Sequence, residues 1–425
     1  MVETECYSIL RQRRKVSKKL NLSYFISKRI TREQKEGFAS TIHTIAIVII
    51  SVGLAAAIIS FLVMKGFQNT VKEKIFSFTG HLLIQKQSLE RSMEEEPFNF
   101  YTPAFTNPQG NDNIRHSQEY AHKVGIVKAQ DEVLGVVLKG VGKSFDQKSF
   151  EPYLIEGKFI KFPDSAYSNQ VVVSKIIADK LRAKVGDDLG VHFLQNPPRF
   201  RKLKIAGIYQ THLSEYFDSK IIIGDIRLIR RLNDWSDSLA GGVEIFLHDV
   251  EKVDATQEWV GESMDFDLDV QKISDLYMQV FEWLNLVSRQ VNMILAIILL
   301  VICVNMVSIV LILVMERTQM IGMLKALGAS NGAVRSVFIF QGMNLILKGL
   351  FWGNVLGLSL CFIQDQFKIV KLNPHDYYME FVPISWNWEV VGLLNLLTFA
   401  VVTLVLLLPT MVISRINPIR AIRFD

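Results

Sequence analysis

Four long apolar runs, unevenly spaced, constrain the fold of this chain more than any local motif. Three of them contain no Asp, Glu, Lys or Arg: Ile42–Met64, Val291–Met315 and Val390–Ile413. The fourth, Val337–Ile363, contains one charged residue, Lys348. Each run has at least the roughly 20 residues that a helix needs to cross a bilayer, where every backbone N–H must be bonded internally. The sequence therefore predicts four transmembrane helices.

The loops between these runs differ in length. Residues 65–290 can hold a folded domain, whereas residues 316–336 and 364–389 are short connections. Residues 1–41 carry ten Lys and Arg against four Asp and Glu, and such a tail resists translocation. The N-terminus, residues 316–336 and residues 414–425 are then expected in the cytoplasm. The large loop and residues 364–389 are then expected to face outward, which in a Gram-negative bacterium would place the protein in the inner membrane and the large loop in the periplasm.

Composition agrees with a small helical bundle joined to a soluble domain. The chain is 49% hydrophobic, with a mean hydropathy of +0.24. Within residues 65–290, runs rich in Val, Ile and Leu and bounded by turn residues predict strands, and two further runs predict short helices. The strands are Gly80–Gln85, Val133–Val141, Gln170–Ser174, Leu189–Leu194, Lys202–Tyr209, Lys220–Ile223 and Gly242–Leu247; the helices are Ile176–Ala183 and Ile226–Leu232.

This pattern predicts an α+β domain with mixed sheets. Ser88–Gln118 has no periodicity, so we expect a loose surface excursion there.

Lys348, inside the third apolar run, has three interpretations. Its side chain snorkels to the membrane surface, it faces a polar partner, or it marks an element that begins later than the apolar run suggests. We favour the last, with Val337–Lys348 partly at the cytoplasmic interface.

The sequence shows no complete catalytic motif. Gly140–Ser144 resembles the end of a phosphate-binding loop, but Val137 stands where that loop needs a glycine. The eight histidines show no metal-ligand spacing, and no nucleophile elbow is present. We therefore expect no catalytic residues, no metal, no nucleic-acid binding and no enzyme activity in this chain on its own.

The short loop Glu316–Ser330 is the most informative segment. Four apolar residues recur at helical spacing and predict a stripe, namely Met320, Met323, Leu324 and Leu327, while Arg317, Gln319, Gly322 and Lys325 lie off it. Gly328 would end this helix, and Ser330 would cap the next one. The segment is either an ordinary connector or a lever on which another protein pushes.

Glu316–Ser330 also resembles the coupling-helix signature of FtsX-like, macrolide-exporter-type ABC permeases, and Ile416–Arg423 resembles their C-terminal ending. Ser40–Phe67, Leu372–Tyr378 and Phe217–Ile226 are similar to stretches of one branch, the lipoprotein-releasing permeases of the LolC/LolE type. The resemblance covers nearly the whole chain. It implies four transmembrane helices and a large extracytoplasmic α+β domain of the MacB-like periplasmic type.

The resemblance implies partners as well. Family members pair with a second permease copy or a paralogue and with two cytoplasmic ATPase subunits, so ATP and magnesium would be bound by the partner and no cofactor by this chain. The residues implied in ATPase coupling are Glu316, Arg317, Met320, Ile321, Gly322, Met323, Leu324, Lys325, Leu327 and Gly328.

The implied substrate is a lipoprotein, taken from the outer leaflet between the first two spans. The residues expected at this gate are Phe61, Met64, Phe67 and Val71, facing Val291, Met293, Ile294 and Ile298. Their flexible apolar side chains suit acyl chains, although plain helix packing or lipid contact stays an alternative for each.

A periplasmic lipoprotein carrier would bind a hairpin loop of the large domain. The matching segment, Leu194–Arg201, is short; Pro197 and Pro198 would hold Arg199 and Phe200 out as a tip, or the segment is a tight turn. Two other functions stay open: a mechanotransmitting relative that controls a cell-wall hydrolase, and a MacB-type exporter of drugs or peptides.

Overall fold

The structure is a computed structural model that describes residues 38–87, 94–101, 105, 110–129, 132–164 and 166–412. The chain divides into two compact units. The helical unit holds the described parts of 1–66, 286–369 and 383–425, and the sheet unit holds those of 67–285 and 370–382. The short segment 370–382 therefore belongs with the large domain, although it is distant from it in sequence.

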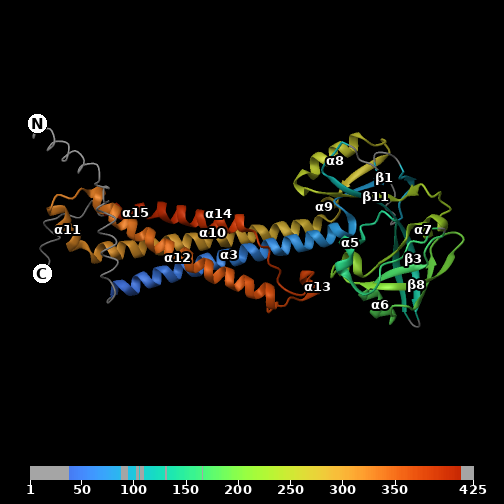
Figure 1. Ribbon diagram of the computed structural model, residues 1–425, viewed down its shortest axis with the longest axis horizontal. Coiled ribbons are helices and arrows are strands. Elements are labelled where there is room, and N and C mark those ends of the chain that lie inside the picture. Colours follow the sequence, from blue (N-terminus) through green and yellow to red (C-terminus); the bar gives the residue numbers. More distant parts are fainter. Residues whose placement is uncertain are drawn as a thin grey trace, which may run out of the picture. The chain divides into compact units, whose positions relative to one another are not determined.

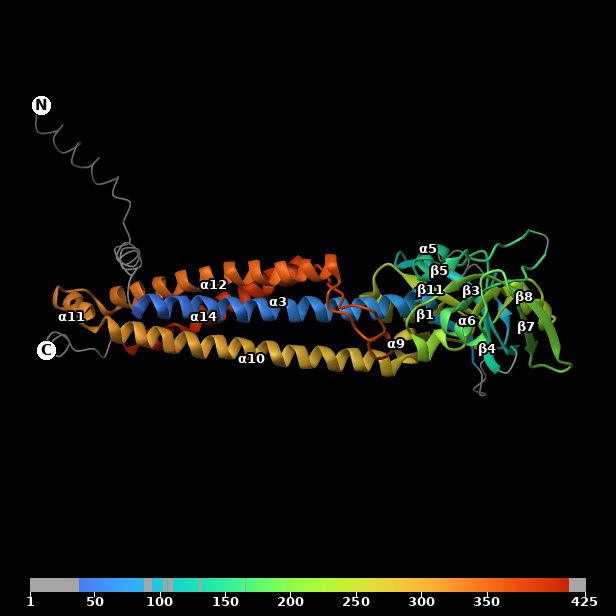
Figure 2. The ribbon, with the colours of Figure 1, turned by 90° about the horizontal axis from the view of Figure 1, so that it is seen from below.

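Four helices are long and apolar enough to cross a membrane, over Thr41–Thr79, Met278–Glu316, Asn331–Phe367 and Trp388–Thr410. Figures 1 and 2 show them side by side as α3, α10, α12 and α14. The bounds are α3 Phe38–Thr79, α10 Met278–Glu316, α11 Thr318–Ala326, α12 Asn331–Phe367, α14 Trp388–Val405 and α15 Leu407–Thr410. The predicted end of the last apolar run, Ile413, lies outside the described residues.

Glycines let α12 approach α3 closely. Gly349, Gly353 and Gly357 stand four residues apart on one face of α12, and a Cβ at Gly349 would lie 2.6 Å from Ile50 of α3. Ser51 of α3 donates a hydrogen bond to the carbonyl oxygen of Gly349 at 3.0 Å. Small residues with this spacing are typical of helix pairs in membranes, where dispersion contacts replace the hydrophobic effect.

Lys348 marks no boundary, contrary to our preferred interpretation. Helix α12 begins at Asn331, where Ser330 accepts a hydrogen bond from the backbone N–H of Ala333 at 3.3 Å. It continues without a break to Phe367, and the Lys348 side chain is exposed beside the buried Gly349. An intact helix through the lysine is possible because a long side chain can leave the packed face without disturbing the backbone.

The sheet unit contains a ten-stranded sheet with path order β12-β1-β11-β3-β4-β9-β6-β8-β5, and β7 pairs with β3 and β8. Pairs β4/β9 and β6/β8 are parallel and the others antiparallel. The strands are β1 Leu82–Lys86, β3 Ile114–Ala129, β4 Glu132–Val141, β5 Leu154–Gly157, β6 Gln170–Ser174, β7 Asp188–Phe193, β8 Arg199–Tyr209, β9 Ile221–Asp225, β11 Gly242–Leu247 and β12 Leu268–Lys272, with a separate ribbon of β2 Phe98–Asn99 and β10 Leu239–Ala240.

The sheet unit also contains short helices. They are α5 Gln147–Phe150, α6 Lys175–Leu181, α7 Ile226–Leu232, α8 Val253–Glu262, α9 Ile273–Leu276 and α13 Pro374–Tyr377, with single turns at Glu151–Tyr153, Ser214–Asp218 and Val250–Lys252. Two of them begin at capped residues that end a strand: Ser174 accepts from the N–H of Ile177, and Asp225 from that of Arg227. Such caps satisfy N–H groups that have no partner within the helix.

The seven predicted strands and both predicted helices are confirmed, with boundaries shifted by a few residues. The expectation of a loose excursion over Ser88–Gln118 is wrong in part, because β3 begins at Ile114 and β2 occupies Phe98–Asn99. Residues 88–93, 102–104 and 106–109 of this stretch lie outside the described residues. The start of β3 is polar, and its buried side chains are satisfied by partners distant in sequence, which no local pattern reveals.

Candidate functional site

Helix α11 joins α10 to α12 through hydrogen-bonded ends. The N–H of Arg317 bonds to the carbonyl of Leu313 at 3.2 Å, which carries the end of α10 into α11. At the other end, Gly328 has a φ of +87°. Its N–H bonds to Lys325 at 3.0 Å, and that of Ala329 bonds to Leu324 at 2.9 Å. This pair of bonds is the Schellman arrangement, and it ends the helix as predicted.

The predicted apolar stripe is divided between two faces of α11. Met320 and Leu324 pack against the core of the helical unit. Ile321, which is fully buried, packs there as well, whereas Met323 is 55% and Leu327 86% exposed. Gly322 was expected off the stripe but is buried, because the bundle itself covers this side of the helix.

The remaining residues of the predicted coupling segment lie at the ends or flanks of α11. Glu316 is the exposed last residue of α10, while Arg317 and Lys325 are half-buried. The face that stays open to a partner therefore consists of Met323 and Leu327, with the exposed polar Gln319 on the same helix. Their role in coupling remains a prediction.

The residues predicted to form a lipid gate are not one open surface. Phe67 and Val71 are buried in the core of the sheet unit, where the Phe67 ring meets Trp283 edge-on at 5.3 Å. Met64 is buried and Phe61 half-buried in the helical unit. On α10, Met293 and Ile294 are exposed, and Val291 and Ile298 are half-buried. Packing, the alternative noted above, describes Phe67 and Val71 better than a gate does.

The predicted carrier-binding loop is a hairpin turn between β7 and β8. Pro197 and Pro198 lie in the connection, but Arg199 pairs with Phe193 and Phe200 with His192 in the ladder. The expectation that Arg199 and Phe200 project as a tip is therefore wrong. Arg199 instead binds Asp234 at 2.8 Å, and the Phe200 ring lies 4.7 Å from that of His192.

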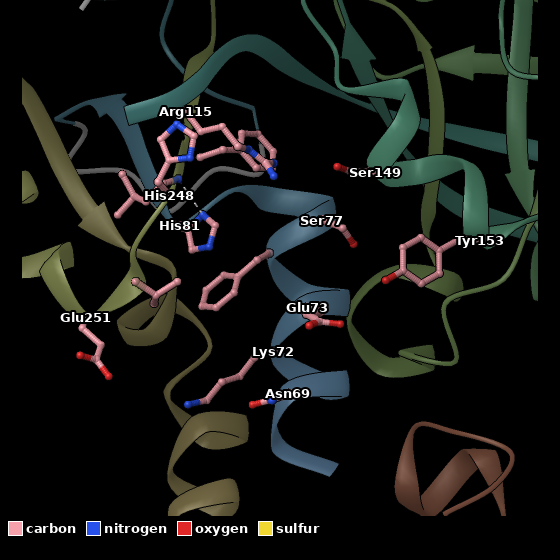
Figure 3. A pocket seen from close by; sticks show the side chains of 14 residues that line it. Asn69, Lys72, Glu73, Ser77, His81, Arg115, Ser149, Tyr153, His248 and Glu251 are labelled. Carbon is pink, nitrogen blue, oxygen red and sulfur yellow. Dashed lines mark hydrogen bonds between the residues drawn. The ribbon is translucent and has the colours of Figure 1, made fainter. Parts of the chain in front are cut away.

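The sheet unit contains a cavity of about 790 Å³ that the sequence did not predict. Figure 3 shows the side chains that line it. Asn69, Lys72, Glu73 and Ser77 line it from α3. His81, Arg115, Ser149, Tyr153, Phe246, His248 and Glu251 line it from other segments. These segments are far apart in the sequence, so no spacing could have revealed the cavity.

One histidine of this cavity, His81, is uncharged at neutral pH. Burial, together with the nearby Arg115 guanidinium, lowers the pKa of His81 to about 4. The His81 ring stacks on Phe76 at 4.3 Å, and its Nδ1 accepts the N–H of Leu247 at 3.2 Å. A neutral, hydrogen-bonded imidazole of this kind is held in place as a structural acceptor.

A second cavity, of about 450 Å³, contains a buried ion pair. Lys139 and Glu244 are each only 2% exposed, and Nζ lies 2.5 Å from Oε1. The Lys139 ammonium also donates to the carbonyl oxygen of Phe78 at 2.5 Å, and Gln118 donates to the second Glu244 oxygen at 2.7 Å. This network joins the end of α3 to strands β3, β4 and β11.

Two family profiles match the chain and together span most of it. The MacB-like periplasmic core domain matches residues 44–262, and the C-terminal region of FtsX-like permeases matches residues 292–418. The first match alone covers more than half of the chain. The chain belongs to the FtsX-like, MacB-type permease family. It is thus a membrane protein and a permease subunit of the ABC transporter class, whose members work with a cytoplasmic ATPase.

Named relatives extend the comparison over the full length of the permease. The lipoprotein-releasing system transmembrane protein LolC of Neisseria meningitidis serogroup B is 22% identical over 95% of this chain and 100% of that protein. LolC of Haemophilus influenzae is 24% identical over 95% of this chain and 99% of that protein. The periplasmic region of MacB from Actinobacillus actinomycetemcomitans matches 47% of this chain and 92% of that one at 13% identity, with a TM-score of 0.34.

Proposed function

We propose that this permease is the membrane subunit of an ABC transporter that extracts lipoproteins from the outer leaflet of a bacterial inner membrane. One observation supports this most directly: similarity to the lipoprotein-releasing proteins LolC extends over 95% of the chain and includes both the sheet unit and the helical unit.

In this proposal, α11 receives the force of ATP-driven closure. Its exposed apolar side chains, Met323 and Leu327, would insert into a groove of the ATPase. The start of α11 is hydrogen-bonded to the end of α10 through Arg317, and residues 327–330 connect its end to α12 without a break, so a displacement of α11 would reach α10 and α12. ATP and magnesium belong to the ATPase in this scheme, and this chain contributes no catalytic group.

The proposed arrangement has both termini and α11 in the cytoplasm and the sheet unit in the periplasm, with all four candidate helices crossing the membrane. A second permease, identical or paralogous, would complete the translocation path, and two ATPase subunits would bind it. A periplasmic carrier would accept the released lipoprotein. The short β7/β8 turn offers such a carrier less surface than a long hairpin.

A reconstituted release assay tests the function. Proteoliposomes with the permease, its cognate ATPase and a lipidated protein should release that protein on addition of ATP, and an unlipidated version should give no signal. The purified permease alone should not hydrolyse ATP, because no complete phosphate-binding loop exists in it. If ATP drives efflux of a small hydrophobic dye but no lipoprotein release, the exporter function replaces this one. Copurification of a cell-wall hydrolase without lipoprotein release would favour the mechanotransmitter.

A further inference from the structure

A polar cavity of about 770 Å³ on the sheet unit is lined by five arginines against three aspartates. The arginines are Arg199 and Arg201 on β8 and Arg227, Arg230 and Arg231 on α7. Residues two apart on a strand share a face, as do residues three and four apart on a helix. Two elements of the sheet unit, labelled α7 and β8 in Figure 1, therefore direct guanidinium groups into one space.

Two of these arginines are already neutralised by carboxylates. Arg199 binds Asp234 at 2.8 Å, and Arg227 binds the buried Asp225 at 2.8 Å. The lining residue Asp164 is engaged by Lys143 at 2.7 Å. Within the described part of the chain, Arg201, Arg230 and Arg231 have no such carboxylate partner. The cavity therefore keeps a local excess of positive charge.

Arg230 is the decisive residue. It is only 4% exposed, and its Nε donates to the carbonyl oxygen of Leu239 at 2.6 Å. Its Nη2 has no hydrogen-bond partner among the described residues, and the same is true of the buried Nε of Arg201. A buried guanidinium donor without an acceptor costs free energy, because it has lost its hydration without compensation. An acceptor with negative charge that reaches these groups would remove that cost.

We infer that this cavity is a binding site for a phosphate group, with Arg230, Arg231 and Arg201 as its ligands. Guanidinium groups match tetrahedral oxyanions through paired, charge-assisted hydrogen bonds. The volume exceeds what a bare phosphate fills, and the lining is mostly polar, so a phosphate carried on a small polar group fits better than an acyl chain. Free phosphate and the phosphate of a glycerophospholipid headgroup share this chemistry. The site is separate from α11 and does not depend on the proposed transport function.

Isothermal titration of the full-length permease in uncharged detergent tests the site, with inorganic phosphate, glycerol 3-phosphate and sodium chloride as titrants. We expect saturable binding of a phosphate compound with a Kd below about 1 mM. Arg230→Gln and Arg231→Gln should each weaken it at least tenfold. Arg231 is exposed, so its variant folds even if the loss of the Arg230–Leu239 bond destabilises the other. The matched control, Arg182→Gln, removes an exposed arginine from the end of α6 and should leave binding unchanged.

The titrants also identify the source of the phosphate. Tighter binding of glycerol 3-phosphate than of inorganic phosphate, with competition by phosphatidylglycerol vesicles but not by phosphatidylcholine vesicles, assigns the site to a headgroup. Equal binding of both compounds assigns it to phosphate itself. The inference is overturned if neither compound binds saturably, or if Arg182→Gln weakens binding as much as Arg231→Gln, since the effect would then be one of net charge.

Discussion

The Lys139–Glu244 pair shows how strongly a single buried residue can depend on its partner. Both side chains are buried. Lys139 also donates a hydrogen bond to the carbonyl oxygen of Phe78, and Glu244 also accepts one from the side-chain amide of Gln118. The Lys139 ammonium lies 5.0 Å from the centre of the Phe78 ring and 5.6 Å from that of Tyr120. Such a pair stabilises the fold only as a complete network, because desolvating either charge alone is costly.

We predict that Lys139→Met lowers the free energy of unfolding by about 3–5 kcal/mol, since it leaves the Glu244 carboxylate buried without its cation. The double variant Lys139→Met/Glu244→Gln should recover at least half of that loss, because no uncompensated charge remains. Chemical denaturation in detergent measures both values. Equal instability of the single and double variants would show that the packing of the lysine, and not charge pairing, accounts for the effect.

His81 predicts a dependence of stability on pH. Its pKa falls from 6.5 to about 4 on folding, through burial and the Arg115 charge, so the unfolded chain binds the proton more strongly between these values. The contribution of His81 to the free energy of unfolding is therefore constant above about pH 6.5 and becomes destabilising as the pH falls towards 4. The stability lost across this window is on the order of 1–3 kcal/mol, with allowance for partial solvent screening.

The variant His81→Asn isolates this effect, because an amide oxygen can still accept the N–H of Leu247 but does not titrate. We expect the difference in melting temperature between the wild-type protein and this variant to narrow, or to reverse in favour of the variant, from about pH 7 to about pH 4. Thermal scans at stepped pH measure it. Parallel melting curves at every pH would mean that His81 titrates alike in the folded and unfolded states.

At the scale of elements, α11 has one face that packs against the helical unit and one face that is exposed. Leu324 contacts the core of the helical unit, so a charge there would disturb the bundle as well as any partner contact. Leu327 is 86% exposed and offers a cleaner test of coupling. We predict that Leu327→Asp leaves the melting temperature within the small range typical of surface changes but weakens ATPase binding at least tenfold, because a charge would be buried in the contact.

The matched control for this variant is Asn331→Asp, which places the same charge on the exposed first residue of α12, away from the open face of α11. It should retain the ATPase through affinity purification and keep most of the stimulated hydrolysis. Loss of the ATPase in both variants would indicate a general effect of negative charge. Retention in both would show that α11 is only a connector between α10 and α12.

At the scale of the whole molecule, the positions of Lys and Arg predict the orientation of the four candidate helices. A cysteine at Asp237, in the sheet unit, should react with a membrane-impermeant thiol reagent in cells with a permeabilised outer membrane, and one at Gln319 should not. Mass tagging on gels measures the reaction. The native Cys303 and Cys361 are buried and should contribute little background. Labelling at Gln319 would place α11 outside the cytoplasm and contradict its proposed contact with an ATPase.

Local patterns determined the elements of this permease. Runs such as Val291–Met315 identified the long helices because a span needs a continuous length without charges. Strands such as Gln170–Ser174 and the caps at Gly328 and Ser330 were equally local, since each depends on propensity or on a hydrogen bond within a few residues. The same patterns, together with the coupling-helix resemblance, were enough to indicate the family.

Tertiary structure alone decided which residues face one another. In the structure, the apolar stripe of α11 lies on two faces, and Phe67 and Val71 are buried in the sheet unit. Arg199 and Phe200 belong to a strand. Tertiary structure also completed β3 with distant partners and gathered arginines from β8 and α7 into one cavity. The physical reason is common to all of these. Periodicity shows that a helix or strand has an apolar side and a polar side. The groups that cover each side come from segments that are far along the chain and that only the fold brings together.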